Sequence, residues 1–440
     1  MRQDASIADT REAAKPGQRI GRSVLTIAFY FPPFSMSSGY LRPLKFAEYL
    51  PAYGWTADIL TVDPCVHPPD VCSLNGSPIE HVRVYRARAL DTGRHLSLFG
   101  RYPWMLAAPD RWWTWWLSGV LCGLRVIRRQ RPAVLFSTYP IATAHLIGWT
   151  LHRLTGIPWI AEFRDPMTDG IYHRNRVVRT VNRWIERRSL ETCAVAVFVA
   201  PSARSDYARR YPHVSASKLV VIPNGYDDEA FAGLASQKPV MPSADRPLLL
   251  VHSGVLYPEE RDPRPFFTAL RALKASGQIS ERSLRVVLRG TGYDDYHRRL
   301  IGEHGIADIV RVEPSIPYRD ALREMLSADG LLLFQAASVN LQIPAKAYEY
   351  LRAQRPIFAL TDPAGDTAAM LASAGVGCIA RLDSDADVHA KLQGFLAALR
   401  RGEIAVADEH EIVRHSRRAR TAELARVLDA LAPDRVPVEP

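Results

Sequence analysis

Short apolar segments alternate with helix-like segments along most of the chain, and this alternation restricts the fold more than any other feature. One series starts at 24–30 and includes 158–163, and a second starts at 248–252 and includes 330–334. Continuous apolar runs of this length are typical of strands that are buried on both faces of a parallel sheet. Two such series predict an α/β protein with two doubly wound, Rossmann-like domains that face each other across a cleft.

The length of 440 residues also favours two domains, because it exceeds what one ordinary core supports. Residues 1–22 offer little to bury, and 232–245 are small, polar and proline-bearing. The predicted parts are a disordered tail at 1–22, an N-terminal domain at 23–231, a linker at 232–245, a C-terminal domain at 246–425 and a C-terminal tail at 426–440.

The composition predicts where the protein works and what it binds. A net charge of +10 favours anionic partners, namely phosphorylated donors, nucleic acid or an anionic membrane face. The five cysteines are scattered without metal-ligand spacing, which favours a reducing compartment and no zinc site. Asp383, Asp385 and Asp387 are better explained as a solvated helix cap than as a metal site. Since we find no signal peptide or membrane-spanning run, we expect a cytoplasmic enzyme with neither metal nor cofactor.

The segment 342–351 carries the strongest candidate for a ligand site. Pro344 suits the first position of a helix, because its missing N–H would have no partner there. Lys346 and Glu349 are three residues apart and share one face of that helix. Free N–H groups and a lysine suit a phosphate, while a carboxylate one turn later suits paired sugar hydroxyls. The pattern indicates a nucleotide-sugar pocket, and the alternative is a solvated ion pair.

Further candidates follow the carboxyl ends of predicted strands, where open α/β sheets bind ligands. Some of these candidates are small residues, which let the backbone approach a phosphate, and others carry charged side chains. These candidates are Gly39, Arg164, Asp165, Ser253, Gly254, Arg261 and Gly290. Ordinary βα turns or salt-bridged turns are the alternative explanations.

A tryptophan-rich stretch precedes and begins a predicted helix that ends near Gln130. Arg125, Arg128 and Arg129 lie on the same helix. Aromatic rings beside arginines suit an anionic membrane surface, and they also suit packing on a large core. The tryptophans concerned are Trp112, Trp113, Trp115 and Trp116. Nucleic acid is not expected as a partner, because no recognisable nucleic-acid module is present.

The chain resembles glycosyltransferase family 4 and its relatives with the GT-B fold. The resemblance covers about 24–390 and rests on six pieces in the order found in the family. These are Tyr30-Phe31-Pro32-Pro33 with Leu41-Arg42-Pro43-Leu44-Lys45-Phe46, Phe163-Arg164-Asp165-Pro166, Ile222-Pro223-Asn224-Gly225-Tyr226-Asp227, Ser253-Gly254 and the helix of Lys346 and Glu349. The resemblance implies a nucleotide-diphosphate sugar in the C-terminal domain and the acceptor in the N-terminal domain.

The resemblance also implies roles for individual residues. Glu349 would hold the ribose hydroxyls, while Lys346 and Arg261 would neutralise the diphosphate. Gly39 would let the opposing loop close on the same phosphates. Arg164 and Asp165 would face the transferred sugar and the acceptor. Because family members retain the anomeric configuration, we expect retention here.

Two departures from the family pattern bear on the donor. The family has paired glutamates eight positions apart, and Leu341 stands eight before Glu349, with Gln342 beside it. A carboxylate contact to the donor sugar is therefore missing or replaced. The basic residue that usually follows the Ser253-Gly254 position is also absent.

We therefore expect a retaining, metal-independent glycosyltransferase. Its donor would be a UDP- or GDP-sugar, and its acceptor a polysaccharide or a lipid-linked glycan. The expected location is cytoplasmic, at the inner face of the membrane. The alternatives are a sugar-nucleotide epimerase of the same architecture and a catalytically silent GT-B scaffold.

Overall fold

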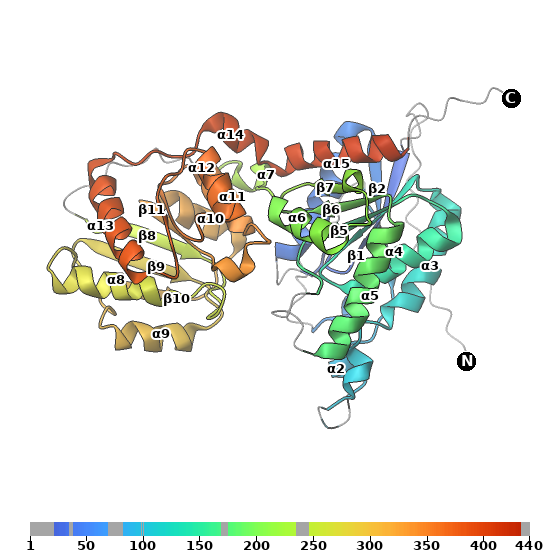
Figure 1. The fold of residues 1–440 in the computed structure, drawn as a ribbon, viewed down its shortest axis with the longest axis horizontal. Helices are drawn as coiled ribbons and strands as arrows, with labels where there is room; N and C mark the ends of the chain where they lie inside the picture. Colours follow the sequence, from blue (N-terminus) through green and yellow to red (C-terminus); the bar gives the residue numbers. More distant parts are fainter. Residues whose placement is uncertain are drawn as a thin grey trace.

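The computed structural model describes residues 22–34, 38–68, 82–97, 99, 101–168, 175–234 and 246–432. The predicted tail at 1–22 lies outside these residues apart from Arg22, and so does most of the predicted linker. The chain forms two lobes, one built from each series of strands (Figure 1).

The N-terminal lobe is a seven-stranded parallel sheet with the order β3-β2-β1-β4-β5-β6-β7. Strands β1, β4 and β5 are buried along almost their whole length, as is typical of a parallel sheet whose two faces are covered by helices. The strands are β1 (Arg22–Ala28), β2 (Trp55–Val62), β3 (Arg83–Ala87), β4 (Val134–Thr138), β5 (Trp159–Phe163), β6 (Val195–Phe198) and β7 (Leu219–Val221). The helices are α1 (Leu41–Tyr49), α2 (Thr92–His95), α3 (Trp115–Gln130), α4 (Ala142–Thr155), α5 (Arg176–Thr192), α6 (Pro201–Arg210) and α7 (Asp228–Phe231).

The C-terminal lobe is a six-stranded parallel sheet with the order β10-β9-β8-β11-β12-β13. The strands are β8 (Leu248–Ser253), β9 (Leu284–Arg289), β10 (Val310–Glu313), β11 (Gly330–Phe334), β12 (Ile357–Leu360) and β13 (Ile379–Ala380). The helices are α8 (Arg264–Ala275), α9 (Asp294–Glu303), α10 (Tyr318–Ser327), α11 (Ala345–Ala353), α12 (Asp366–Ser373) and α13 (Asp385–Arg401). The predicted fold class, with two doubly wound domains, is confirmed.

The end of the chain returns to the N-terminal lobe. After α14 (Glu409–Arg414), helix α15 (Arg417–Leu431) crosses over and packs against α1 (Figure 1). Leu424, Ala425 and Leu428 are buried in that contact. The boundary predicted between 425 and 426 therefore falls inside a helix, because one apolar face holds α15 on the N-terminal lobe along its length.

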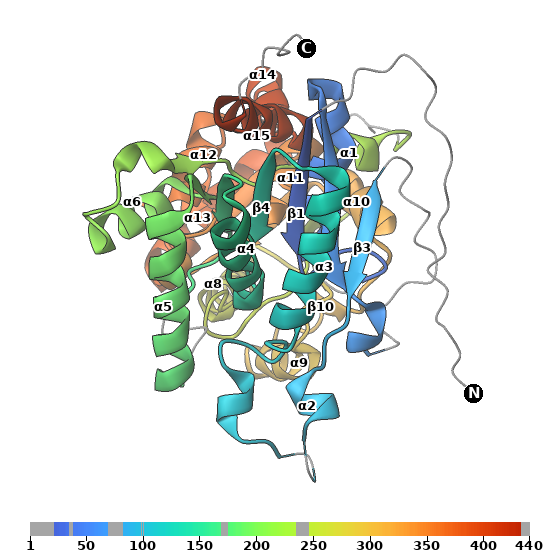
Figure 2. The same ribbon diagram turned by 90° about the vertical axis from the view of Figure 1, so that its right-hand side faces the viewer.

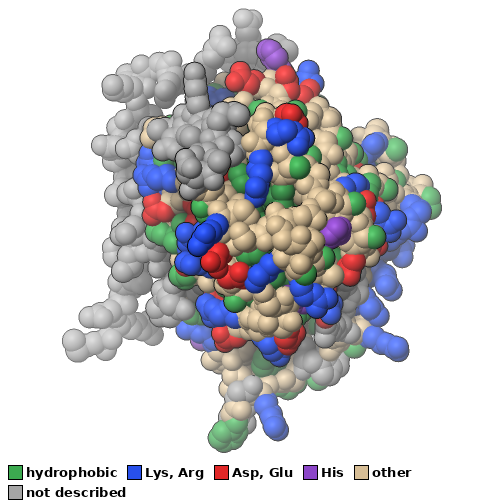
Figure 3. Space-filling model, turned by 90° about the vertical axis from the view of Figure 1, so that its left-hand side faces the viewer, with side chains coloured by type: hydrophobic (Ala, Val, Ile, Leu, Met, Phe, Trp, Pro, Cys, Tyr) green, Lys and Arg blue, Asp and Glu red, His purple; other side chains and the backbone are tan. Residues whose placement is uncertain are grey.

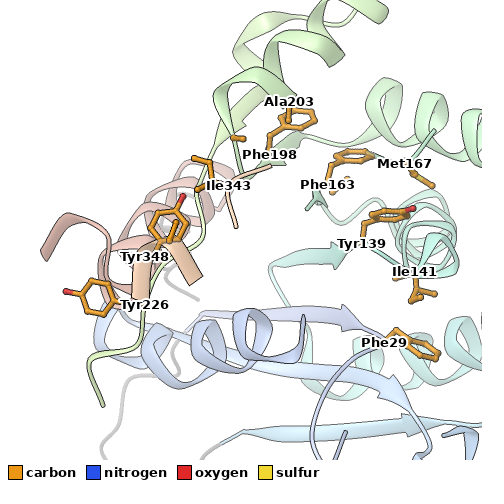
Figure 4. Close-up of a cluster of buried hydrophobic side chains, with 14 of the residues drawn as sticks. Phe29, Tyr139, Ile141, Phe163, Met167, Phe198, Ala203, Tyr226, Ile343 and Tyr348 are labelled. Carbon is orange, nitrogen blue, oxygen red and sulfur yellow. The ribbon is translucent and has the colours of Figure 1, made fainter. Parts of the chain in front are cut away.

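The two lobes share a buried apolar cluster. Phe198 and Ala203 reach it from the N-terminal lobe, and Ile343 and Tyr348 reach it from the segment around α11 (Figure 4). The Ser202 amide also donates to an Asp366 carboxylate oxygen at 2.7 Å. Helix α11 is therefore held at the junction of the lobes, which fixes where its polar side chains lie.

Candidate functional site

The strand order of the C-terminal sheet reverses between β8 and β11, and the predicted donor residues gather at that switch point. Gly254 follows β8 with a φ of 105°, and Lys346 lies in the first turn of α11, which follows β11. A Cβ on Gly254 would lie only 3.0 Å from the Lys346 Nζ atom. Glycine is thus required both for this backbone conformation and for the approach of the lysine. The structure brings Lys346 and Gly254 together as the sequence predicted.

Arg261 lies close to the same lysine. Its Nη1 atom donates to the Val255 carbonyl at 2.7 Å, and its guanidinium lies 5.3 Å from the centroid of the Tyr257 ring. Burial lowers the pKa of Lys346, and the charge of Arg261 lowers it further. Two cations held this close to each other favour an anion between them. Ser253 ends β8, and its backbone N–H donates a hydrogen bond to the Tyr350 hydroxyl oxygen at 3.0 Å.

Glu349 lies one turn after Lys346 and is held by a residue from another helix. The Tyr318 hydroxyl donates to the Glu349 Oε1 atom at 2.6 Å. Burial raises the pKa of Glu349, while the hydrogen bond from Tyr318 and the charge of Arg417 oppose this rise. Arg417, at the start of α15, also interacts with Asp227 of the N-terminal lobe. Glu349 therefore lies where the two lobes and the returning helix meet.

A cavity of about 510 Å³ adjoins this group in the C-terminal lobe. It lies beyond the carboxyl ends of β9 and β10, and the segment Pro314–Ser315 of its wall leads directly to Tyr318. Gly290 is part of the wall rather than of the lysine group. A Cβ on Gly290 would lie 2.8 Å from the Ser315 Oγ atom, so glycine lets the two loops approach. The cavity is lined by Gly290, Gly292, Tyr293, Asp294, Asp295, Tyr296, Pro314 and Ser315.

The predicted residues of the N-terminal lobe lie at the carboxyl end of β5. Arg164 donates from Nε to the Tyr139 carbonyl at 2.6 Å and from Nη1 to the Gly39 carbonyl at 2.5 Å. The arginine thereby joins the loop that carries Gly39 to the loop after β4. Gly39 lies in a short 3₁₀ turn, while residues 35–37 of the same loop are outside the described part.

Asp165 lies in the loop that follows β5 and is half-buried. Burial raises its pKa, and the adjacent Arg164 opposes that rise. Burial likewise raises the pKa of the Tyr257 phenol, and Asp165 adds to this effect from across the cleft. The charge of Asp165 therefore acts on the loop that follows Gly254. Together with the electrostatic interaction between Arg417 and Asp227, this links the predicted residues of the two lobes.

The loop before α11 carries no acid where the family pattern has its first glutamate. Leu341 and Gln342 occupy this part, and the Gln342 carbonyl accepts a hydrogen bond from the Gln335 side chain at 2.7 Å. The Asn340 amide donates to an Asp362 carboxylate oxygen at 2.6 Å, which ties the loop to the residues after β12. The loop is braced by amide side chains and presents no carboxylate of its own.

The aspartates at 383–387 belong to a helix cap, as the sequence predicted. Ser384 caps α13 by accepting from the Asp387 N–H, and Asp387 itself pairs with Lys391 at 3.0 Å. Asp383 pairs with Arg381. Within the described ranges, no group of three or more His, Cys, Asp and Glu side chains is arranged to hold a metal ion.

The tryptophan-rich stretch faces mostly inward. Trp115 is fully buried in the core, and Trp112 and Trp113 are half-buried. Of the four tryptophans predicted to face a membrane, only Trp116 is classed as exposed, and its Nε1 atom donates to Thr150 of α4 at 3.0 Å. Core packing therefore explains most of this stretch, which corrects the prediction of a membrane surface made by all four. None of the helices in the described segments has both the length and the apolarity needed to cross a bilayer.

Three polar residues of the site were not predicted from the sequence. Arg417 is distant in sequence from every motif, and Tyr318 belongs to none of them. His252 lies within a mostly apolar strand, so the sequence pattern did not mark it as a candidate site residue. Only a short loop separates the end of β10 from Tyr318, the first residue of α10. This position just after the carboxyl end of a strand would have marked Tyr318 as a candidate site residue.

Residues 42–225 match the family model described as Glycosyl transferase 4-like domain. This part of the N-terminal lobe is therefore similar to glycosyl transferase 4-like domains. The match includes α1, the Arg164-Asp165 pair and the Asn224-Gly225 turn, so the predicted resemblance is confirmed over this part of the chain. No curated protein sequence matches the chain.

Solved structures extend the likeness to both lobes. A sucrose-phosphate synthase from Thermosynechococcus elongatus is similar with a TM-score of 0.64 and 17% identity, covering 93% of this chain and 99% of that one. The Anabaena protein HepE in complex with UDP and glucose is similar with a TM-score of 0.60 and 13% identity, covering 93% of this chain and 100% of that one. A UDP-forming trehalose-phosphate synthase from Burkholderia xenovorans, in complex with glucose-6-phosphate, has a TM-score of 0.64 and 12% identity. The match covers 93% of this chain and 100% of that one. At these identities the likeness establishes the GT-B fold of the chain.

Proposed function

We propose that the protein transfers a sugar from a UDP- or GDP-sugar to a glycan or a lipid-linked acceptor. The observation that carries this proposal is the grouping of Lys346, Gly254 and Glu349 at the switch point of the C-terminal sheet, facing the glycosyl transferase 4-like domain. The proposal is also supported by solved structures of this fold that are described with UDP and glucose or with UDP-glucose.

Each group has a part in holding the donor. The ammonium of Lys346 and the guanidinium of Arg261 offset the negative charge of the diphosphate, which grows as the bond to the sugar breaks. The Glu349 carboxylate accepts hydrogen bonds from the ribose hydroxyls. The cavity at Gly290 takes the nucleobase, since it is joined to Glu349 through the loop that carries Tyr318. Because two cations already face the diphosphate, the proposed transfer needs no metal ion.

The N-terminal lobe would hold the acceptor. Asp165 is proposed as the acid at the acceptor side, because its charge acts on Tyr257 of the opposite lobe. Arg164 is proposed to position the loops at the carboxyl end of the N-terminal sheet, since it donates hydrogen bonds to the carbonyl oxygens of Tyr139 and Gly39. Retention of the anomeric configuration is proposed on the resemblance to the family alone.

A nucleotide screen tests the donor site without a known acceptor. UDP or GDP at one hundred times its dissociation constant should stabilise the protein by about 2.7 kcal/mol, equal to a rise in melting temperature of about 5 to 10 °C. Differential scanning fluorimetry with UDP, GDP, ADP and the corresponding monophosphates measures this. A silent scaffold would show no shift with any of them, and an epimerase would convert the sugar nucleotide with no acceptor present.

We also propose that an anionic membrane surface holds the acceptor side, through the outer face of α3, α4 and α5 rather than through the buried tryptophans. These three helices form one layer on the N-terminal lobe (Figure 2). Leu117 is 65% exposed and Trp184 is 45% exposed on this layer. Helix α5 adds a row of arginines, namely Arg176, Arg179, Arg183, Arg187 and Arg188. In contrast, basic and acidic side chains are interspersed on the outer face of the C-terminal lobe (Figure 3).

Vesicle flotation tests this surface. Replacing Arg183 and Arg187 by glutamine should weaken binding to vesicles rich in phosphatidylglycerol about 30-fold, because each arginine near an anionic surface contributes about 1 kcal/mol. Raising the salt should weaken the wild type as well. The matched control replaces the exposed Arg298 and Arg299 of α9 by glutamine and should bind like the wild type. Wild-type protein that stays unbound at low salt would exclude the surface.

A further inference from the structure

His252 is the second-last residue of β8 and is completely buried beside the proposed donor site. Its Nδ1 atom lies 2.8 Å from the Leu332 carbonyl oxygen of β11. Its Nε2 atom lies 3.0 Å from the Lys346 Nζ atom and 3.1 Å from the Gly254 carbonyl oxygen. The imidazole therefore connects the core of the sheet with the lysine at the start of α11.

The partners of His252 determine which ring nitrogen carries hydrogen. A carbonyl oxygen only accepts, so Nδ1 must be the protonated nitrogen that donates to Leu332. Nε2 is then left with a lone pair, which accepts a hydrogen bond from the Lys346 ammonium. Burial lowers the pKa of His252 well below its usual value, and the charges that face it, Lys346 and Arg261, lower it further. The ring is therefore neutral, and its contact with the Gly254 carbonyl is not a hydrogen bond in this state.

The neutral partner distinguishes Lys346 from the lysines that form ion pairs elsewhere. Lys45 contacts Asp227 at 2.9 Å, Lys274 contacts Asp308 at 2.7 Å, and Lys391 contacts Asp387 at 3.0 Å. Each of these charges is balanced by a carboxylate. Lys346 is oriented by a lone pair that carries no net charge, and Glu349 attracts it electrostatically without forming a direct ion pair in the described structure, so its ammonium stays available for an anion.

We propose that His252 is a positioning residue that holds the Lys346 ammonium towards the diphosphate of the donor without neutralising it. This inference rests on the proposed function, because it assigns the role to the same donor site. The ligand group that it concerns is the terminal phosphate of a nucleoside diphosphate, the part that a nucleoside monophosphate lacks.

Calorimetric titration with UDP and UMP, and with GDP and GMP, tests this role. For the diphosphate that the wild type binds, His252→Phe should lower the ratio of diphosphate to monophosphate affinity about tenfold, the size expected for a hydrogen bond to a charged group. His252→Gln keeps an acceptor and should restore most of the ratio. The matched control is His145→Phe, which removes another buried histidine, 2.8 Å from Ser137 in the N-terminal lobe, and should leave the ratio unchanged.

The outcomes separate this inference from the proposed function. Equal losses of affinity for diphosphate and monophosphate, or an unchanged ratio in His252→Phe, would overturn the role of His252 and leave the donor site intact. A wild type that binds neither UDP nor GDP would overturn both. If His252→Phe does not fold, nitrogen-15 NMR of the histidines in the wild type decides. An unprotonated Nε2 at neutral pH supports the role, and a protonated one refutes it.

Discussion

Replacing Lys346 by alanine is expected to lower kcat/KM for sugar transfer by about 100- to 1,000-fold, which is the usual cost of removing one group that stabilises developing negative charge. The Lys346 Nζ atom lies beside Gly254, where we propose that the diphosphate approaches the backbone, whereas Arg261 is held by its hydrogen bond to the Val255 carbonyl. Glu349→Ala is expected to abolish transfer as well, through loss of the ribose contact. Initial rates with a radiolabelled sugar nucleotide and a membrane or glycan fraction as acceptor measure both effects.

The variants must lose activity because the donor site is altered and not because the protein unfolds. Lys346 is half-buried at the edge of the cleft, so its removal leaves no carboxylate without a partner. The melting temperature of Lys346→Ala should therefore stay close to that of the wild type. Lys274→Ala removes a lysine from the outer end of α8 and should keep full activity. Wild-type rates in Lys346→Ala and Glu349→Ala would count against the donor site.

The sequence predicted the structure well wherever a local pattern of apolar and polar residues determined a strand or a helix. The strands β8, β11 and β12 are buried on both faces, so their apolar runs are continuous and their ends are well defined. Pro344 marks the start of α11, which places Lys346 and Glu349 on one face. These local rules were enough to predict the fold class and the grouping of Lys346 with Gly254.

The residues that were missed depend on contacts between distant segments. Arg417 reaches Glu349 only because α15 returns to the N-terminal lobe, and no local pattern contains this path. His252 lies in a mostly apolar strand, and its polar contacts with the Leu332 carbonyl of β11 and with Lys346 of α11 arise only when these segments pack together. Such residues are identified by the three-dimensional packing of elements, which the sequence does not show directly.

The tryptophans were misjudged although a signal was present. Gly119 and Gly123 lie one turn apart, and a Cβ on either would come within 2.6 Å of Ile147 or Leu151 of α4. Small residues with this spacing mark the face by which two helices approach closely. Trp115 lies on the same face, four residues before Gly119, and is therefore buried. Attention to the glycines would have assigned Trp115 to the core.

Replacing Arg42 by methionine is expected to lower the free energy of unfolding of the N-terminal lobe by about 3 to 5 kcal/mol, the cost of leaving one partner of a buried ion pair alone. Arg42 of α1 contacts Glu162 of β5 at 2.8 Å, and both side chains are almost completely buried. The same guanidinium donates to the carbonyls of Ile222 and Pro223 after β7. Urea denaturation followed by tryptophan fluorescence measures the loss.

A double-mutant cycle shows whether this loss comes from the stranded carboxylate. In Arg42→Met the Glu162 side chain keeps the hydrogen bond from Thr138, at 2.6 Å, and a longer-range attraction to Arg164, but it loses the cation that is in direct contact with it. Combining Arg42→Met with Glu162→Met removes that charge, so the double variant should be clearly more stable than the sum of the single losses predicts. The exposed pair of Arg401 and Glu403 is the control, because Arg401→Met should change the stability by less than about 1 kcal/mol. Additive losses in the cycle would show that packing around Arg42, and not its charge, holds α1 to the sheet under the cleft.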